Sequence, residues 1–327
     1  MGVDSHCSQT ECNETGECLY GNHDRYTCEH WQTTEIAAEE SSTEHDTQVA
    51  PWHSDALSKL DINLVSVQRR PHVIALVGPH NAGKTTYLAA IHLLCLREPV
   101  LKDFSFAGSL TLRGWQRIIE SMQYPRDKNL PPSYPPHTPN SNERVPGLLH
   151  YTLRTNEDEG LQEILLTDAP GEWFTSWACN PDESMYPGAV WTIRNADAYL
   201  FFVDSDALAG DEPGVARSTI ESMAMRLAEE RNEKPVGIVW SKSDVKIDGV
   251  IEQQVETILS RELPDATSFR MSVRPQKGND PEMMVESLKD TLEFATTKQP
   301  VAIDFQTDCP TGNPEDRFLS YRGNGHV

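Results

Sequence analysis

The segment Val73–Thr86, VIALVGPHNAGKTT, joins an apolar run to a glycine-rich loop. The apolar run predicts a buried β-strand, because it is short, continuous and rich in β-branched residues. The loop matches G-x-x-x-x-G-K-[ST] at Gly78, Gly83, Lys84 and Thr85, which is the pattern of a phosphate-binding loop. A strand that runs into this loop predicts a nucleotide-binding protein.

Each fixed residue of the loop has a physical task. Gly78 permits a tight turn, and Gly83 lets backbone N–H groups approach phosphate oxygens. Lys84 is expected to bridge the β and γ phosphates, and Thr85 to bind Mg²⁺, at the start of a predicted helix Thr85–Leu96. The expected nucleotide contacts of the loop are Gly78, Pro79, His80, Asn81, Ala82, Gly83, Lys84, Thr85 and Thr86.

A second motif follows the predicted strand Leu161–Asp168. Asp168 begins the sequence DAPG, a D-x-x-G pattern in which the aspartate holds the Mg²⁺ shell. Gly171 ends this pattern, and its N–H is expected to sense the γ-phosphate. A plain Asp-containing turn is the alternative.

A third motif follows the predicted strand Pro235–Trp240. The residues Ser241, Lys242 and Asp244 of SKSD resemble the [NT]-K-x-D box that reads guanine, although serine replaces the usual amide or threonine. A later strand, Thr267–Val273, ends in Ser272 and Val273, which are expected to close over the base, with a simple strand end as the alternative.

The order GPHNAGKT, DAPG, SKSD resembles the Ras-like GTPases of the TRAFAC class over about Leu57–Thr297. The flanking segments resemble the bacterial Double-GTPase proteins of conflict and defence systems. The resemblance implies an α/β P-loop NTPase fold with a doubly wound, mostly parallel sheet, GTP or GDP and Mg²⁺ as ligands, and protein partners. A continuous apolar run at Ala198–Val203 fits a central parallel strand. Helices are expected at Met223–Arg231, Ile251–Arg261 and Met283–Ala295.

A long insertion at residues 98–146 precedes the DAPG strand. Its Ser109–Tyr124 segment has apolar residues at helical spacing, and a proline-rich stretch after it predicts an exposed loop. The family resemblance implies that Thr138 binds Mg²⁺ and the γ-phosphate, with Ser141 as the alternative and an inert loop threonine as a further one. Leu148–Arg154 and Leu161–Thr167 are predicted to form a hairpin.

Hydrolysis requires a residue that orients water, and Glu172 stands where Ras-like proteins have glutamine. Because a carboxylate there lies near an anionic phosphate, slow or partner-stimulated turnover is expected. Trp173, Phe174 and Trp177 follow, either as a docking surface in the switch or as core residues. Candidate arginine fingers in cis are Arg113, Arg117, Arg126 and Arg194.

The ends of the chain differ from this core. We expect a Cys/His-rich leader at 1–32, an acidic linker at 33–56, the GTPase domain at 57–298 and a polar tail at 299–327. Cys7, Cys12, Cys18 and Cys28 cluster in the leader with the spacing C-x₄-C-x₅-C-x₉-C. A structural Zn²⁺ site is the favoured explanation, with an iron–sulfur cluster or no metal as alternatives.

The net charge of the chain argues against some classes of binding partner. The net charge is −22, of which Met1–Ser58 carries 12 acidic residues against Arg25, or −11. This balance argues against nucleic acid or anionic membrane as partners. The chain has no run of 18 apolar residues and no secretory signal pattern, which indicates a cytoplasmic protein. Protein partners are expected at the switch regions and the leader.

The sequence therefore predicts a GTP-binding switch with slow or partner-stimulated hydrolysis. Two alternatives stay open at this point. One is an ATP-directed P-loop NTPase, which the serine at Ser241 leaves open. The other is a non-catalytic adaptor whose conformation depends on bound nucleotide.

Overall fold

A computed structural model describes residues 4–7, 31–34, 56–58, 61–66, 70–97, 101, 104–123, 147–156, 160–180, 182, 186–273 and 281–297. The chain divides into two compact units, Met1–Val49 and Ala50–Val327. In the first unit, strands β1 (Asp4–Cys7) and β2 (Trp31–Thr34) pair antiparallel, with Cys7 opposite Trp31. Cys12, Cys18 and Cys28 lie outside the described residues, so the zinc site of the leader stays a prediction.

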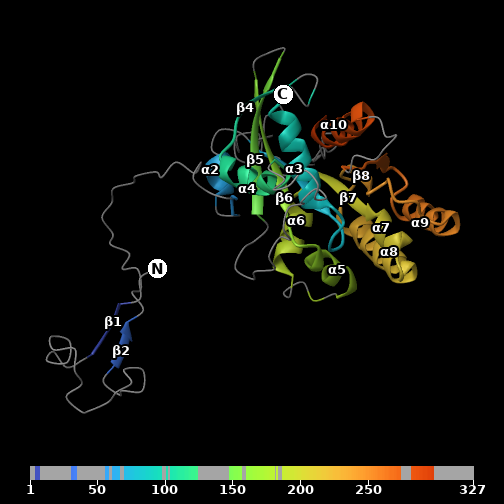
Figure 1. The fold of residues 1–327 in the computed structure, drawn as a ribbon, viewed down its shortest axis with the longest axis horizontal. Helices are drawn as coiled ribbons and strands as arrows, with labels where there is room; N and C mark the ends of the chain where they lie inside the picture. Colours follow the sequence, from blue (N-terminus) through green and yellow to red (C-terminus); the bar gives the residue numbers. More distant parts are fainter. Residues whose placement is uncertain are drawn as a thin grey trace, which may run out of the picture. The chain divides into compact units, whose positions relative to one another are not determined.

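The second unit is built on a sheet, in which the described residues form seven strands in the order β4-β5-β6-β3-β7-β8-β9 (Figure 1). The strands are β3 (His72–Val77), β4 (Phe104–Gly108), β5 (Gly147–Thr155), β6 (Leu161–Asp168), β7 (Ala198–Asp204), β8 (Val236–Ser241) and β9 (Thr267–Arg270). β4, β5 and β6 pair antiparallel, and every pair from β6 to β9 is parallel. The mostly parallel sheet and the β5–β6 hairpin are therefore confirmed.

The central strands are buried on both faces, as continuous apolar runs require. All residues of β3, β7 and β8 are buried. β3 lies between β6 and β7, both of which follow it in sequence, so the strand order reverses beside β3. In open α/β sheets, ligands bind at the carboxyl ends of the strands where such a reversal occurs.

Helices cover both faces of the sheet, as in a doubly wound fold (Figure 1). Their bounds are α2 (Ile62–Ser66), α3 (Lys84–Cys95), α4 (Leu112–Gln123), α5 (Gly171–Cys179), α6 (Pro187–Asn195), α7 (Ser205–Ala209), α8 (Pro213–Glu230), α9 (Gly249–Glu262) and α10 (Pro281–Thr297). α3, α4 and α10 pack on one face, and α5 to α9 pack on the other. The expected helix at Met223–Arg231 is the second half of the longer α8.

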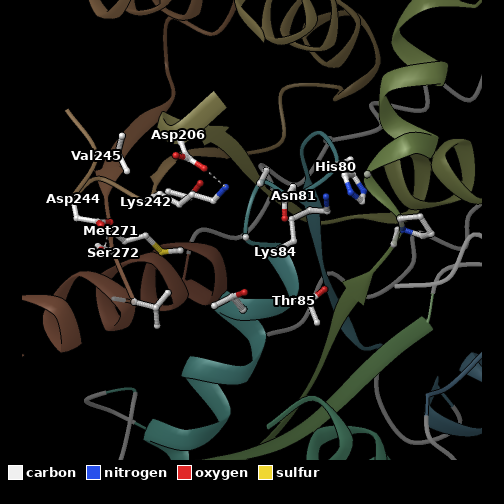
Figure 2. Close-up of a pocket in the computed structure, with 18 of the residues that line it drawn as sticks. His80, Asn81, Lys84, Thr85, Asp206, Lys242, Asp244, Val245, Met271 and Ser272 are labelled. Atoms are coloured by element: carbon white, nitrogen blue, oxygen red, sulfur yellow. Dashed lines mark hydrogen bonds and ion pairs between the residues drawn. The ribbon is translucent and has the colours of Figure 1, made fainter. Parts of the chain in front are cut away.

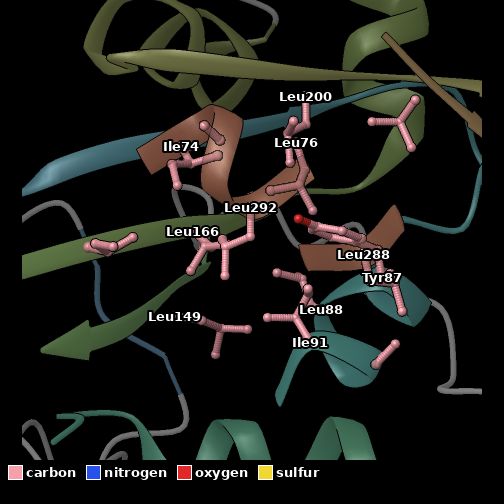
Figure 3. Close-up of a cluster of buried hydrophobic side chains, with 14 of the residues drawn as sticks. Ile74, Leu76, Tyr87, Leu88, Ile91, Leu149, Leu166, Leu200, Leu288 and Leu292 are labelled. Carbon is pink, nitrogen blue, oxygen red and sulfur yellow. The ribbon is translucent and has the colours of Figure 1, made fainter. Parts of the chain in front are cut away.

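Alternating side chains of each strand enter the two cores. Ile74 and Leu76 of β3 pack with α3 and α10, and Figure 3 shows Tyr87 and Leu88 of α3 and Leu292 of α10 around them. Ala75 and Val77 face the opposite core, which contains α5, α6 and α8. The phosphate loop therefore leaves a strand that is fixed on both sides.

The segment after DAPG is a helix rather than an exposed docking surface. Phe174 and Trp177 of α5 are fully buried in the core beneath α8. Arg226 of α8 stacks over the Trp177 ring, 5.0 Å from its centroid, and donates to the carbonyls of Trp177 and Asn180. The possibility that these aromatics form a docking surface is thus wrong, because their one-sided spacing buries them.

The insertion is described in part. α4 confirms the predicted helix, and its Trp115 is buried and donates its indole N–H to the His150 carbonyl. Thr138 and Ser141 lie outside the described residues. Within the part of the chain that the structure describes, no helix is long and apolar enough to cross a membrane.

Candidate functional site

Four parallel strands end beside one another at the same edge of the sheet. β3 ends at Val77, β6 at Asp168, β7 at Asp204 and β8 at Ser241. Their pairing places the three predicted motifs side by side, because each motif directly follows one of these strands. The site is therefore a consequence of the strand order.

The phosphate loop turns tightly between β3 and α3. A Cβ on Gly78 would lie 2.8 Å from Cβ of Phe202, so a side chain there would collide with β7. Asn81 has φ 64° and Gly83 has φ 85°, both in the left-handed region, and the helix begins immediately afterwards at Lys84. The backbone N–H groups of the loop and of the helix N-terminus form an anion site.

Lys84 is buried within the loop. Its Nζ donates to the carbonyl oxygens of Gly78 and Pro79, each at 2.9 Å. Burial lowers the pKa of Lys84 to about 8, although the negative charges of Asp168, Glu172 and Asp204 oppose the shift. A phosphate at this position would add negative charge beside the buried ammonium and so favour its charged form.

Thr85 and Asp168 meet across the site. Oγ1 of Thr85 donates to Oδ1 of Asp168 at 2.9 Å, joining the phosphate loop to the end of β6. A hydroxyl and a carboxylate in contact provide the hard oxygen ligands that Mg²⁺ prefers. These two residues fit a magnesium ion, and they are the ones that would hold it.

The DAPG turn packs directly on the phosphate loop. A Cβ on Gly171 would overlap the backbone of Pro79 and His80. Beside this contact, Nδ1 of His80 lies 2.6 Å from a carboxylate oxygen of Glu172. The first turn of α5 is thus held against the third residue of the loop.

At the other end of the site, two carboxylates hold Lys242. Its Nζ lies 2.8 Å from Asp204 and 3.5 Å from Asp206. Oγ of Ser272 donates to Asp244 at 2.6 Å, which fixes one carboxylate oxygen of the predicted base-reading residue. The buried Ser241 hydroxyl donates to the Val203 carbonyl at 3.2 Å.

One cavity of about 330 Å³ connects these segments (Figure 2). In Figure 2, His80 lies near one end of the pocket, and Asp244 and Ser272 lie near the other. The predicted contacts that line the cavity are His80, Asn81, Ala82, Gly83, Lys84, Thr85, Thr86, Gly171, Glu172, Ser241, Lys242, Asp244, Ser272 and Val273. Gly78 and Pro79 contribute through their carbonyls to Lys84, and Asp168 through its contact with Thr85.

Further lining residues were not predicted as contacts. They are Ala169, Pro170, Asp206, Val245 and Met271. Ala169, Pro170, Val245 and Met271 are sequence neighbours of predicted residues, so widening the motifs by one position would have found them. Asp206 adds a second acid beside Lys242, which the SKSD pattern alone does not reveal.

The described arginine candidates do not line the cavity. Arg113 and Arg117 lie on α4. Arg194 lies in the last turn of α6, and its carbonyl accepts from Lys234 just before β8 begins, at the opposite edge of the sheet. Arg126 and Thr138 lie outside the described residues.

The chain is similar to a known protein family and to solved structures. A model of the family described as Double-GTPase 2 matches residues 72–292. Among solved structures, the Roco2 RocCORdC protein of Methanosarcina barkeri bound to GDP is similar, with 12% identity and a TM-score of 0.33. That match covers 68% of this chain and 48% of the other, so this chain spans about half the length of that structure. No curated protein matches the chain.

Proposed function

Since the chain belongs to the Double-GTPase 2 family of GTP-binding proteins, we propose that it is a molecular switch that hydrolyses GTP slowly alone and faster with a protein partner. The family resemblance further supports a role in a bacterial conflict or defence system. The absence of a membrane-spanning helix among the described residues fits a cytoplasmic location.

The proposal of a GTP-hydrolysing switch rests on one observation. A single cavity is lined at once by the phosphate loop, the DAPG turn, the SKSD box and the loop at Ser272. These four segments come from widely separated parts of the sequence, and each has the chemistry for a different part of a nucleotide. Their convergence favours a guanine nucleotide with its phosphates near Lys84 and its base near Asp244.

The phosphate end supplies binding and orientation. Lys84 and the loop N–H groups would neutralise the β and γ phosphates, and Gly171 would direct its N–H toward the γ-phosphate. Thr85 and Asp168 would hold Mg²⁺, with Thr138 proposed as a further ligand. Bound Mg²⁺ would neutralise charge that develops on the phosphate oxygens.

The base end supports recognition of guanine. Asp244 would accept hydrogen bonds from the guanine edge while Ser272 fixes its carboxylate. Two acids hold Lys242, so its aliphatic stem would form one wall beside the base. This arrangement favours GTP over ATP, because the adenine edge presents no matching pair of donors.

Two features of the site support slow turnover. Glu172 places a carboxylate where Ras-like proteins have an amide, and no arginine among the described residues lines the cavity. Both features remove stabilisation of the charge that develops during phosphoryl transfer. A partner that supplies a cation would then accelerate the reaction.

Phosphate release from Mg²⁺–GTP by the full-length protein tests the proposal. We expect turnover below about 0.01 s⁻¹, as for unstimulated switch GTPases. Lys84→Ala should abolish phosphate release. Lys246→Ala is the control, because it removes the same charge from an exposed residue outside the pocket, and it should leave the rate of phosphate release unchanged. Tight GTP binding with release no faster than in Lys84→Ala would instead identify a non-catalytic adaptor.

We propose that the leader carries zinc and recruits partners. Full-length protein purified under reducing conditions should contain about one zinc per chain, and a Cys7→Ser, Cys12→Ser variant should lose it. The same variant should still bind nucleotide nearly normally, because the leader and core are separate compact units. Metal content below about a tenth of an equivalent in fresh wild-type protein would contradict a zinc site.

A further inference from the structure

His80 and Glu172 form a close pair inside the candidate site. Nδ1 of His80 lies 2.6 Å from a carboxylate oxygen of Glu172, and the side chains are 49% and 46% exposed. Both residues line the nucleotide cavity. A half-exposed pair on the wall of a cavity can contact a ligand bound there.

The backbone brings these two side chains together. Gly171 lies so close to the loop that a Cβ there would overlap Pro79 and His80. At its other end, α5 is fixed by the buried Trp177, whose carbonyl accepts from Arg226. The pair therefore results from close packing of the DAPG turn, and not from two long side chains meeting in solvent.

The contact with His80 reduces the repulsion between the Glu172 carboxylate and a γ-phosphate. A carboxylate beside the γ-phosphate repels it, and like charges at close range in a partly desolvated site oppose binding. A carboxylate accepts hydrogen bonds, so Nδ1 of His80 must carry the proton that joins the two groups. This bond fixes one carboxylate oxygen and withdraws negative charge from it.

The other cations of the cavity are already engaged. Lys84 donates to two loop carbonyls, and Lys242 is held by Asp204. Among the described residues, His80 is the basic side chain that pairs with Glu172. No arginine in the described part of the chain lines this cavity.

We propose that His80 is a positioning residue that acts through Glu172. It holds the Glu172 carboxylate toward the attacking water and offsets the charge of that carboxylate beside the γ-phosphate. This inference rests on the proposed GTP hydrolysis. In the reaction, the water oxygen bonds to the γ-phosphorus while the bond from that phosphorus to the β–γ bridging oxygen breaks. The electron pair of that bond leaves with GDP, and the water proton passes through Glu172 to the released phosphate.

A double-mutant cycle tests the coupling. The proteins are full-length wild type, His80→Ala, Glu172→Gln and the double variant, each measured in single-turnover GTP hydrolysis. His80→Ala should slow hydrolysis at least about tenfold when Glu172 is present and less than about twofold when it is glutamine. Equal losses in both backgrounds, or no loss in the wild-type background, would overturn the proposal.

Nucleotide binding provides a readout that does not depend on turnover. His80→Ala should weaken a non-hydrolysable GTP analogue about fivefold relative to GDP, because the uncompensated carboxylate then faces the γ-phosphate. The double variant should restore the wild-type ratio of the two affinities. If wild-type protein binds GTP but releases no phosphate, the proposed GTP hydrolysis is wrong. The ratio of the affinities for the GTP analogue and for GDP still tests the role of His80 in that case. An unchanged ratio in His80→Ala would contradict that role.

His80→Asn adds a conservative comparison, because the asparagine Nδ2 lies close to the position of the imidazole Nδ1. Its amide keeps an N–H donor for Glu172 and cannot become a cation, so it should recover part of the hydrolysis that His80→Ala loses. Recovery of neither the rate nor the affinity ratio by this uncharged donor would show that charge offset, rather than the hydrogen bond, carries the effect. Loss of GDP binding in both variants would mean that His80 only supports the loop and would overturn the proposal.

Discussion

Gly171 packs directly against the backbone of His80, so closely that a single added methyl group would overlap the phosphate loop. The contact joins the turn after β6 to the loop after β3 without any side chain between them. Displacement of either segment by a γ-phosphate must therefore move the other. The first turn of α5 is the element through which the presence of that phosphate would be transmitted.

Gly171→Ala should separate binding of the two nucleotides. We expect affinity for a non-hydrolysable GTP analogue to fall at least about tenfold and GDP affinity to fall less than about threefold, because the added Cβ displaces the turn that senses the γ-phosphate. Isothermal titration of both ligands measures this difference.

Gly214→Ala is the matched control, because a Cβ at this position of α8 meets nothing within 4 Å. It should bind both ligands as wild type does. An equal loss of both nucleotides in Gly171→Ala would show general damage to the loop and contradict a sensing role.

Asp244 and Ser272 should determine the choice of base. Asp244→Asn should weaken GTP and improve xanthosine triphosphate, because the amide reverses one donor–acceptor relation. Ser272→Ala should weaken GTP by roughly threefold to tenfold, since it removes the hydrogen bond that fixes the carboxylate, about 1 kcal/mol. Competition titration measures both effects, and an unchanged ratio of GTP to xanthosine triphosphate in Asp244→Asn would place the base elsewhere.

His92 should make the fold sensitive to acid. It is buried in α3, stacks on Trp115 and lies 2.6 Å from the Tyr151 hydroxyl. Burial lowers the pKa of His92 from 6.5 to about 4, so its stabilising effect is complete above the unfolded pKa of 6.5. That effect is lost as the pH falls from about 6.5 toward about 4, by about 3 kcal/mol in all.

His92→Gln removes this titration and keeps an acceptor for Tyr151. Urea unfolding at pH 7, 6 and 5 should show that the free energy of unfolding falls less steeply in the variant than in wild type. Curves that run parallel over this range would show that another group causes the acid sensitivity.

Much of the fold could be predicted because the central strands have an unambiguous pattern. β3 and β7 are short continuous apolar runs, and burial on both faces requires such runs. Each motif directly follows a strand, so a parallel sheet necessarily gathers the motifs at its carboxyl edge. The doubly wound, mostly parallel sheet then follows from the fold class that the motifs indicate.

The sequence did not predict β4, and it left the surroundings of the α5 aromatics open. The strand β4 is half-exposed and contains Phe104 and Phe106 within a mixed sequence, so it has no clear period. In α5, the spacing of Phe174 and Trp177 by three residues is typical of one helix face, and the sequence left a docking surface and core packing as alternatives, of which core packing is confirmed. Their complete burial reflects packing by α8, which lies far along the chain.

Pairings within the site could not be predicted from the sequence either. His80 and Glu172 meet because Gly171 lets two backbones touch, and Lys242 meets Asp204 because β7 and β8 end side by side. Both contacts depend on the angle at which a loop leaves its strand. Motif patterns specify residue types at fixed spacings, and they carry no information on such angles.

Nucleotide selectivity tests the central claim most directly. In a competition titration of the full-length protein with a fluorescent GDP analogue, unlabelled GTP and GDP should compete at least about 100-fold more effectively than ATP and ADP, as the contacts of Asp244 require. Equal competition by adenine and guanine nucleotides, or preference for ATP, would contradict a guanine-nucleotide switch.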